Sequence, residues 1–346
     1  MSEEKVFIYI SPSADINAYP DNLQGDMSVF RQARSIQHEV QWIFYLMLKD
    51  QGLDVSICHD FPDRGILLIH KSHVKKFAWN PNLFVVSLQW DYKRDDRAQM
   101  HLVSNNYKTT KASLGWLDRL SFQGLQHYVP PIMHPVIIPH DAEREDQIEK
   151  IAFIGDPKNL DEAFKTGAFE SAVQQLGMEF IVRSDPDKMA DFSDIDVVMA
   201  IRKIGQIISN KPPTKLINSW RGGVPAILGC ELGFREARET EYDYIEVDSV
   251  EDVLNALSRL KDDVEFRHEM IANAKRRGAP FSAEGQQQIW VEFFKNTIIP
   301  AYHDWQCRPA VGKFAFLLLR GIRYWMRESL SFIWHHVLRR RSSDYS

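Results

Sequence analysis

Apolar and polar positions in the first part of the chain alternate in a pattern typical of strands separated by helices. Short β-branched and aromatic runs predict buried strands at 6–10, 55–58, 65–70, 83–89 and 101–104. Helices are expected at 28–51, which Ser28 can cap and Gly52 ends, and at 107–120. Strands that alternate with helices predict a parallel sheet covered on both faces.

A change in composition then marks a domain boundary. Four prolines lie between residues 128 and 141, and the residues that follow are mostly charged. A proline-rich segment is a semi-rigid connection, which suits two domains placed across a cleft. We therefore predict a first domain at 1–141, a second at 142–300 and a helical tail at 301–346.

The second domain repeats the alternation of the first. Strands are expected at 150–155, 178–182, 195–201, 225–228 and 244–247. Helices are expected at 160–176, from 231, from 249 where Ser249 begins a capping box, at 281–305 and at 308–341 with a bend near Gly321. The fold class is therefore α/β, with two Rossmann-like domains.

One stretch, 210–229, carries the clearest chemical signal. Pro212 and Pro213 keep a loop extended, and Thr214 can cap a helix whose first turn holds Lys215. A helix start has unpaired N–H groups and a partial positive charge, so lysines there make a site for a polyanion such as a diphosphate. The alternative is a capped helix start that is only solvated.

Further basic and glycine positions fall at strand ends of the same domain. Arg202 follows one strand, Lys211 precedes the predicted helix, and Gly155 ends the first strand of the domain. Ligands of open α/β sheets bind beyond the carboxyl ends of the strands, where these residues would meet. The alternative for Arg202 is an ion pair with a nearby carboxylate.

Segment 195–260 resembles the nucleotide-sugar segment of bacterial GT-B glycosyltransferases. In that family Pro, a small polar residue, Lys and Leu open a helix that ends in Gly-x-Pro before a strand, as residues 213–216 and 223–225 do here. The resemblance implies that Lys215 contacts a donor diphosphate and places the ribose contact on Asn218, where an amide replaces the usual carboxylate. It implies the GT-B arrangement and transfer of a sugar from a nucleotide diphosphate sugar to an acceptor hydroxyl.

Such a transfer requires the acceptor hydroxyl to lose a proton, and an inverting reaction needs a side-chain base for it. The first candidate is Asp26, beside a glycine before the first helix, and Asp15 is the second; His70 at a strand end is a further option. An Asp at such a position is otherwise a turn or cap residue. Asp194 and Asp196 precede a strand instead of following one, so neither a metal nor another cofactor is predicted.

Charge and cysteine content narrow the functional class. The net charge is −5, and because the last 46 residues carry +5, the rest carries −10, which argues against nucleic-acid binding. Three widely spaced cysteines and a charged N-terminal start favour a reducing cytoplasm.

The tail has an amphipathic pattern. Large apolar residues share one side of a helical wheel and basic residues the other. Such a helix predicts peripheral contact with an anionic membrane, at its inner face, through 309–341; the alternative is packing on the first domain. The apolar side has Phe314, Leu317, Leu318, Ile322, Trp325 and Phe332, and the basic side has Lys313, Arg320, Arg323 and Arg327.

Two other functions fit the same pattern. A glycosyltransferase-like protein that binds a nucleotide or glycan without turnover would explain Asn218 at the ribose position. A nucleotide-sugar epimerase of the same architecture would use the free nucleotide sugar as its sole substrate.

Overall fold

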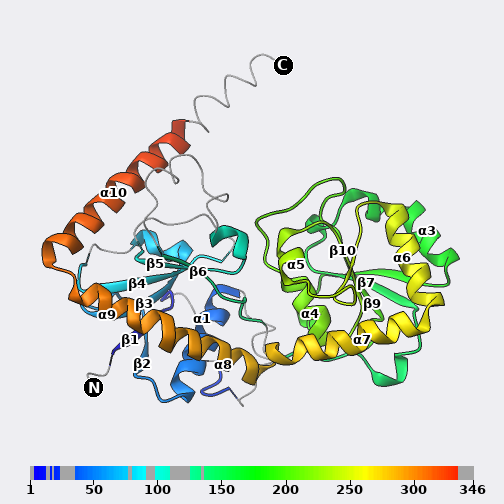
Figure 1. The fold of residues 1–346 in the computed structure, drawn as a ribbon, viewed down its shortest axis with the longest axis horizontal. Helices are drawn as coiled ribbons and strands as arrows, with labels where there is room; N and C mark the ends of the chain where they lie inside the picture. Colours follow the sequence, from blue (N-terminus) through cyan, green and yellow to red (C-terminus); the bar gives the residue numbers. More distant parts are fainter. Residues whose placement is uncertain are drawn as a thin grey trace.

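A computed structural model describes residues 4–12, 16–17, 19–23, 36–76, 80–90, 98–109, 125–133 and 136–333. These residues form two lobes side by side, each built on a parallel sheet (Figure 1). None of the helices in this part of the chain combines the length and the apolar character needed to cross a bilayer.

The first lobe is a six-stranded sheet in the order β2-β1-β3-β4-β5-β6. All its strands are parallel, and β3 and β4 pair over their full length, from Gly65 opposite Leu83 to His70 opposite Leu88. The strands are β1 (Val6–Tyr9), β2 (Val55–Cys58), β3 (Gly65–His70), β4 (Leu83–Leu88), β5 (Met100–Val103) and β6 (Leu125–Tyr128). The helical elements are α1 (Ile36–Asp50), η2 (Lys71–Lys76) and η3 (Asn106–Thr109).

The second lobe is a five-stranded parallel sheet in the order β11-β10-β9-β7-β8. Its strands are β7 (Lys150–Ile154), β8 (Glu179–Arg183), β9 (Val197–Ala200), β10 (Ala226–Leu228) and β11 (Ile245–Glu246). Its α-helices are α3 (Gly167–Gln175), α4 (Thr214–Gly222), α5 (Leu232–Ala237), α6 (Val250–Asp262) and α7 (Val264–Gly278). Short turns are η5 (Ala142–Arg144), η6 (Pro157–Asn159), η7 (Glu162–Lys165) and η8 (Pro186–Lys188).

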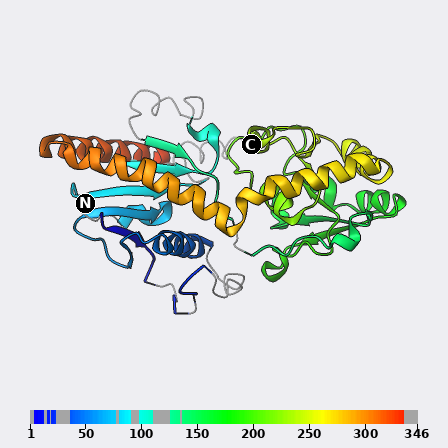
Figure 2. The ribbon, with the colours of Figure 1, turned by 60° about the horizontal axis from the view of Figure 1, so that its bottom comes forward.

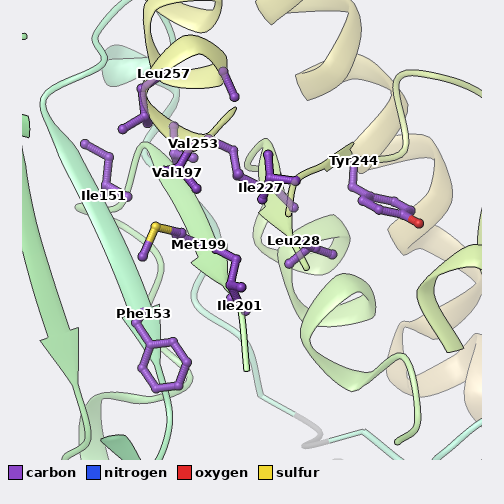
Figure 3. Close-up of a cluster of buried hydrophobic side chains, with 14 of the residues drawn as sticks. Ile151, Phe153, Val197, Met199, Ile201, Ile227, Leu228, Tyr244, Val253 and Leu257 are labelled. Carbon is purple, nitrogen blue, oxygen red and sulfur yellow. The ribbon is translucent and has the colours of Figure 1, made fainter. Parts of the chain in front are cut away.

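The central strands of this sheet are buried on both faces. Ile151 and Phe153 of β7 belong to one apolar cluster with Met199 (Figure 3). Ala152 between them belongs to another cluster. Successive side chains of a strand point to opposite faces. The continuous apolar runs of the sequence follow from this two-sided burial.

After α7 the chain returns to the first lobe. Figure 2 shows the long helical run crossing from one lobe to the other. Trp290 and Phe294 are buried in the core of the first sheet, where the rings of Trp290 and Phe44 lie 4.8 Å apart. The run contains η9 (Ala279–Phe281), α8 (Ala283–Phe293), the π-turn η10 (Phe294–Ile298), α9 (Ile299–Cys307) and α10 (Ala310–Ile333).

The expected α/β class with two parallel sheets is confirmed, with corrections to single elements. Strand β6 was not expected, and the helix expected at 160–176 is a short turn followed by α3. Of the helix expected at 107–120, the described residues form only η3. The division of the chain at 141 and 300 stays a prediction; the helices from Ala283 onward pack on the first sheet.

Candidate functional site

In each sheet, the strand that comes first in the chain lies between the two strands that follow it in the chain. Thus β7 lies between β8 and β9, and β1 lies between β2 and β3. Ligands of open α/β sheets bind beyond the carboxyl ends of the strands at such a switch point. The residues that follow β7, β9 and β10 therefore form the candidate site of the second lobe.

Charged side chains converge on this edge from neighbouring elements. Arg202 follows β9, Glu231 follows β10, and Lys215 lies in the first turn of α4. The Arg202 Nε atom lies 2.9 Å from Glu231 Oε1, and the side chain of Glu231 is 2% exposed. Arg202 thus forms the ion pair with a carboxylate that the sequence analysis gave as the alternative to ligand binding. Its partner, Glu231, lies at the same carboxyl edge of the sheet.

Lys215 is a buried ammonium group at the end of β7. Its Nζ donates a hydrogen bond to the carbonyl oxygen of Ile154 and lies 4.2 Å from the centre of the Phe153 ring. Burial, and then the charge of Arg202, lower the pKa of Lys215 to about 8, while Glu231 opposes the shift. A desolvated cation at a switch point is typical of a functional site.

Glu231 is a site residue that the sequence analysis missed. Burial raises the pKa of its carboxyl group, and the charges of Arg202, Lys215 and Lys211 oppose the rise. Its second oxygen, Oε2, has no hydrogen-bond partner among the described residues. Glu231 looks like an ordinary helix start in the sequence, but its position directly after an apolar strand is the signal that could have identified it.

Gly155 provides the space that Lys215 occupies. Its φ is 136°, and a Cβ atom at this position would lie 2.9 Å from Lys215 Nζ. Any side chain here would strain the backbone and displace the lysine.

We expect Gly155→Ala to lower the free energy of unfolding by about 3 kcal/mol, because backbone strain and a clash with Lys215 add. Gly205 is a matched control in the same lobe, since it has a φ of 71° and open space around it. Gly205→Ala should cost about 1 kcal/mol, from backbone strain alone. Urea denaturation measures both, and equal costs would mean that Lys215 does not constrain Gly155.

The start of α4 differs from the prediction. Thr214 is the first residue of the helix and not its cap; Pro213 holds the cap position, and no side chain caps this end. The first N–H groups of such a helix remain available to an anion. Asn218 lies one turn later, and its Oδ1 is buried without a hydrogen-bond partner in the described part of the chain.

The loop before α4 contacts the first lobe. Asn105, which follows β5 and is fully buried, donates from Nδ2 to the carbonyl oxygens of Ser209 at 3.2 Å and Lys211 at 2.6 Å. Gly233 allows this loop to approach α5 closely, because a Cβ atom at position 233 would lie only 2.5 Å from the Lys211 carbonyl oxygen. The carboxyl ends of β5 and β9 therefore face each other across the lobes.

A second contact between the lobes lies beside the first. Helix α5 of the second lobe packs against η3 of the first. Burial raises the pKa of Glu236 in α5, and the backbone N–H groups of Asn106 and Tyr107 oppose the rise. Together with the bonds of Asn105, this contact joins the carboxyl edge of the first sheet to the second lobe.

The carboxyl edge of the first sheet carries a group of aromatic rings. His73 lies at the centre, with its ring 5.5 Å from Tyr9, 6.3 Å from His38 and 6.4 Å from His70. His70 Nδ1 accepts the backbone N–H of Ser72 at 3.2 Å, so the neutral ring carries its proton on Nε2. In this tautomer Nε2 is a hydrogen-bond donor, and a base role for His70 stays a prediction.

Two titratable groups at the start of α1 lie near this ring group. Burial lowers the pKa of His38, which therefore stays neutral at physiological pH. Burial raises the pKa of Glu39 to about 8, so Glu39 is mostly protonated there. The two predicted bases, Asp26 and Asp15, lie outside the described residues.

Comparison with known proteins bears on the fold. A scan against protein-family models finds no match, and a search of curated proteins finds none either. Among solved structures, the pneumococcal O-GlcNAc transferase GtfA in complex with UDP and GlcNAc is similar with a TM-score of 0.50 and 9% identity, over 75% of this chain and 60% of that chain. This chain has the GT-B fold.

Two other solved structures are similar at lower scores. Sucrose-phosphate synthase from Thermosynechococcus elongatus has a TM-score of 0.49 and 11% identity, over 86% of this chain and 100% of that chain. The Anabaena protein HepE in complex with UDP-glucose has a TM-score of 0.46 and 10% identity, over 85% and 100%.

Within the GT-B fold, the aspartates with Asp-x-Asp spacing are engaged in ion pairs. Asp194 lies 2.9 Å from Lys150 and 2.7 Å from Arg183, while the buried Asp196 lies 3.0 Å from Arg144. The described residues contain no group of three or more His, Cys, Asp or Glu side chains that could hold a metal ion.

Proposed function

We propose that this protein transfers a sugar from a nucleotide diphosphate sugar to an acceptor hydroxyl. The observation that carries the proposal is the buried Lys215 ammonium beside Arg202, at an uncapped helix start on a switch-point edge. A desolvated ammonium, a guanidinium and free N–H groups together favour a diphosphate.

The donor contacts follow from the positions of the side chains. Lys215, the N–H groups at Thr214 and the charges of Arg202 and Lys211 would hold the diphosphate, above the bare backbone of Gly155. Asn218 and Glu231 have oxygen atoms that can accept hydrogen bonds from ribose or sugar hydroxyls. In this proposal Glu231 supplies the carboxylate that the family has at the ribose position and that this chain replaces by Asn218.

In the reaction, the bond between the sugar carbon and the diphosphate oxygen breaks while the acceptor oxygen bonds to that carbon. Negative charge then develops on the leaving diphosphate, and the Lys215 ammonium can stabilise it without reorganisation of solvent. The acceptor proton passes to a base at the edge of the first lobe, for which Asp26 and then Asp15 are proposed. No metal or other cofactor is part of this proposal.

A screen of nucleotide sugars by calorimetry, followed by product analysis with and without acceptors, tests this function. UDP-sugars come first, because the GtfA structure contains UDP and GlcNAc. We expect binding and, with the right acceptor, release of the nucleoside diphosphate together with a glycosylated product. Binding without turnover would favour the non-catalytic alternative, and a changed sugar on the intact donor would favour the epimerase.

We also propose a cytoplasmic location at the inner face of a membrane, with a glycan or a lipid-linked molecule as the acceptor. The support is the basic tail on an otherwise acidic chain, which favours an anionic surface over nucleic acid.

A further inference from the structure

The last described helix, α10, exposes a continuous apolar face. Val311 is 81% exposed, Phe314 66% and Trp325 72%. At 100° per residue all exposed large side chains fall on one arc, which contains no charged residue from Val311 to Met326. The arc consists of Val311, Phe314, Leu318, Leu319, Ile322, Trp325 and Met326.

The basic side of this helix faces the protein instead of the solvent. Lys313 and Arg320 are 9% and 4% exposed. Lys313 Nζ donates to the Gln306 carbonyl oxygen at 3.1 Å, and the Arg320 guanidinium lies 4.9 Å from the centre of the Phe316 ring. The helix therefore packs on the first lobe, as one alternative expected, through Leu317, Phe316 and its cations. Most of its large apolar side chains point outward.

This orientation is unusual for a packing helix. A helix that only completes a core buries its apolar side and solvates its charges. An outward apolar face about 23 Å long, from Val311 to Met326 at 1.5 Å per residue, indicates an apolar partner.

We propose that the outward face of α10 docks the first lobe on an anionic membrane surface. Figure 1 shows α10 along the outer edge of the first lobe. Its apolar face carries the exposed aromatic side chains of Phe314 and Trp325, which suits burial in the interfacial layer of a bilayer. The surrounding sequence is basic, with Arg323 and Arg327 in the helix and Arg339, Arg340 and Arg341 beyond it. An anionic surface complements this charge, whereas the rest of the chain is acidic.

A second copy of the chain fits the face less well. A helix that pairs with one partner helix presents a narrow seam of positions three and four residues apart. Here Leu319 and Met326 extend the apolar arc beyond such a seam and would stay exposed in a pair. The surface does not depend on sugar transfer, so its test is independent of the proposed function.

The test is flotation of the full chain with vesicles of equal parts phosphatidylcholine and phosphatidylglycerol at low salt. We expect the unaltered protein to float with these vesicles and to bind pure phosphatidylcholine several-fold more weakly. The double variant Phe314→Glu/Trp325→Glu should bind these vesicles at least about tenfold more weakly than the unaltered protein, since both side chains are exposed and would enter the lipid. Circular dichroism should show it folded, because neither side chain packs in the core.

The matched control adds the same charge elsewhere. Val182 and Val264 are 43% and 46% exposed in the second lobe, and Val182→Glu/Val264→Glu should bind vesicles as the unaltered protein does. Equal binding by both double variants, or no binding of the unaltered protein, would overturn the proposal. Light scattering that shows a dimer made monomeric by Phe314→Glu/Trp325→Glu would also overturn it and assign the face to a second copy.

Discussion

Replacing Lys215 by Met should make the protein more stable and remove most of its affinity for a nucleotide diphosphate sugar. Met matches the length of the side chain but carries no charge that burial would penalise. Because burial lowers the Lys215 pKa from 10.5 to about 8, and one pKa unit corresponds to about 1.4 kcal/mol, we expect a gain of about 3 kcal/mol in the free energy of unfolding at neutral pH. Donor binding should fall by at least about tenfold, since a charge-assisted contact contributes about 1.5 to 3 kcal/mol.

The pH dependence of stability gives a second measure of the same group. A lysine with a lowered pKa in the folded state destabilises the fold fully below that pKa, here about 8. The penalty fades as the pH rises from about 8 toward the unfolded value of 10.5, where the amine is neutral in both states. The stability gained from Lys215→Met should therefore be largest below pH 8 and shrink above it.

Donor affinity should fall over the pH range in which the stability of the unaltered protein rises. Binding of a diphosphate requires the ammonium form, so the affinity of the unaltered protein should decline above about pH 8, and that of Lys215→Met should stay low and level. Lys203→Met is the control, because Lys203 is exposed and directly follows Arg202 at the same edge of the sheet. A control that loses as much donor affinity as Lys215→Met would mean that only the overall charge matters.

Most strands were predictable because burial on both faces of a sheet requires runs of apolar residues, which can be seen in the sequence. The residues of β2 and β3 coincide with the expected ranges. The continuous apolar run of β3 is typical of a strand buried on both faces, and the β-branched and apolar residues of β2 also favour a strand. Strand β6 could not be recognised, because Leu125, Gln126 and His127 form no such run. Its place comes from pairing with β5, a contact distant in the chain.

The return of the chain to the first lobe was also beyond the sequence pattern. The apolar residues of α8 and α9 predict helices, but their periodicity contains no information on which core they join. Contacts between distant parts of the chain decide this. For example, Trp305 Nε1 donates a hydrogen bond at 3.0 Å to the carbonyl oxygen of Pro81, 224 residues away.

The candidate donor site was only partly visible in the sequence. Arg202, Lys215 and Gly155 could be placed together, because each follows or faces a strand end of one sheet. Glu231 and Asn105 could not be placed, because a carboxylate at a helix start and an asparagine after a strand have many ordinary roles. Their importance comes from burial and from contacts between segments far apart in the chain.

Exchange of Asp26 for Asn should slow sugar transfer by about a hundredfold to ten-thousandfold and leave donor binding unchanged. Asn keeps the size and the turn-forming hydrogen bonds of Asp but loses its basicity, and a positioned base contributes about that factor. The chain segment that holds Asp26 connects β1 to α1, and both elements meet the ring group around His73 at the carboxyl edge. This edge faces the donor lobe through the bonds of Asn105.

The matched variant is His38→Gln, because His38 is the neutral imidazole at the same edge. Single-turnover transfer and donor calorimetry, measured for both variants from pH 5 to about 9, separate the two bases. With Asp26 as the base, the rate should stay level down to about pH 5, since a carboxylate titrates near pH 4. A rate that falls as the pH drops toward His38's lowered pKa, and that only His38→Gln abolishes, would assign the proton to the imidazole. Equal losses of transfer and binding in Asp26→Asn would instead mean that Asp26 shapes the loop.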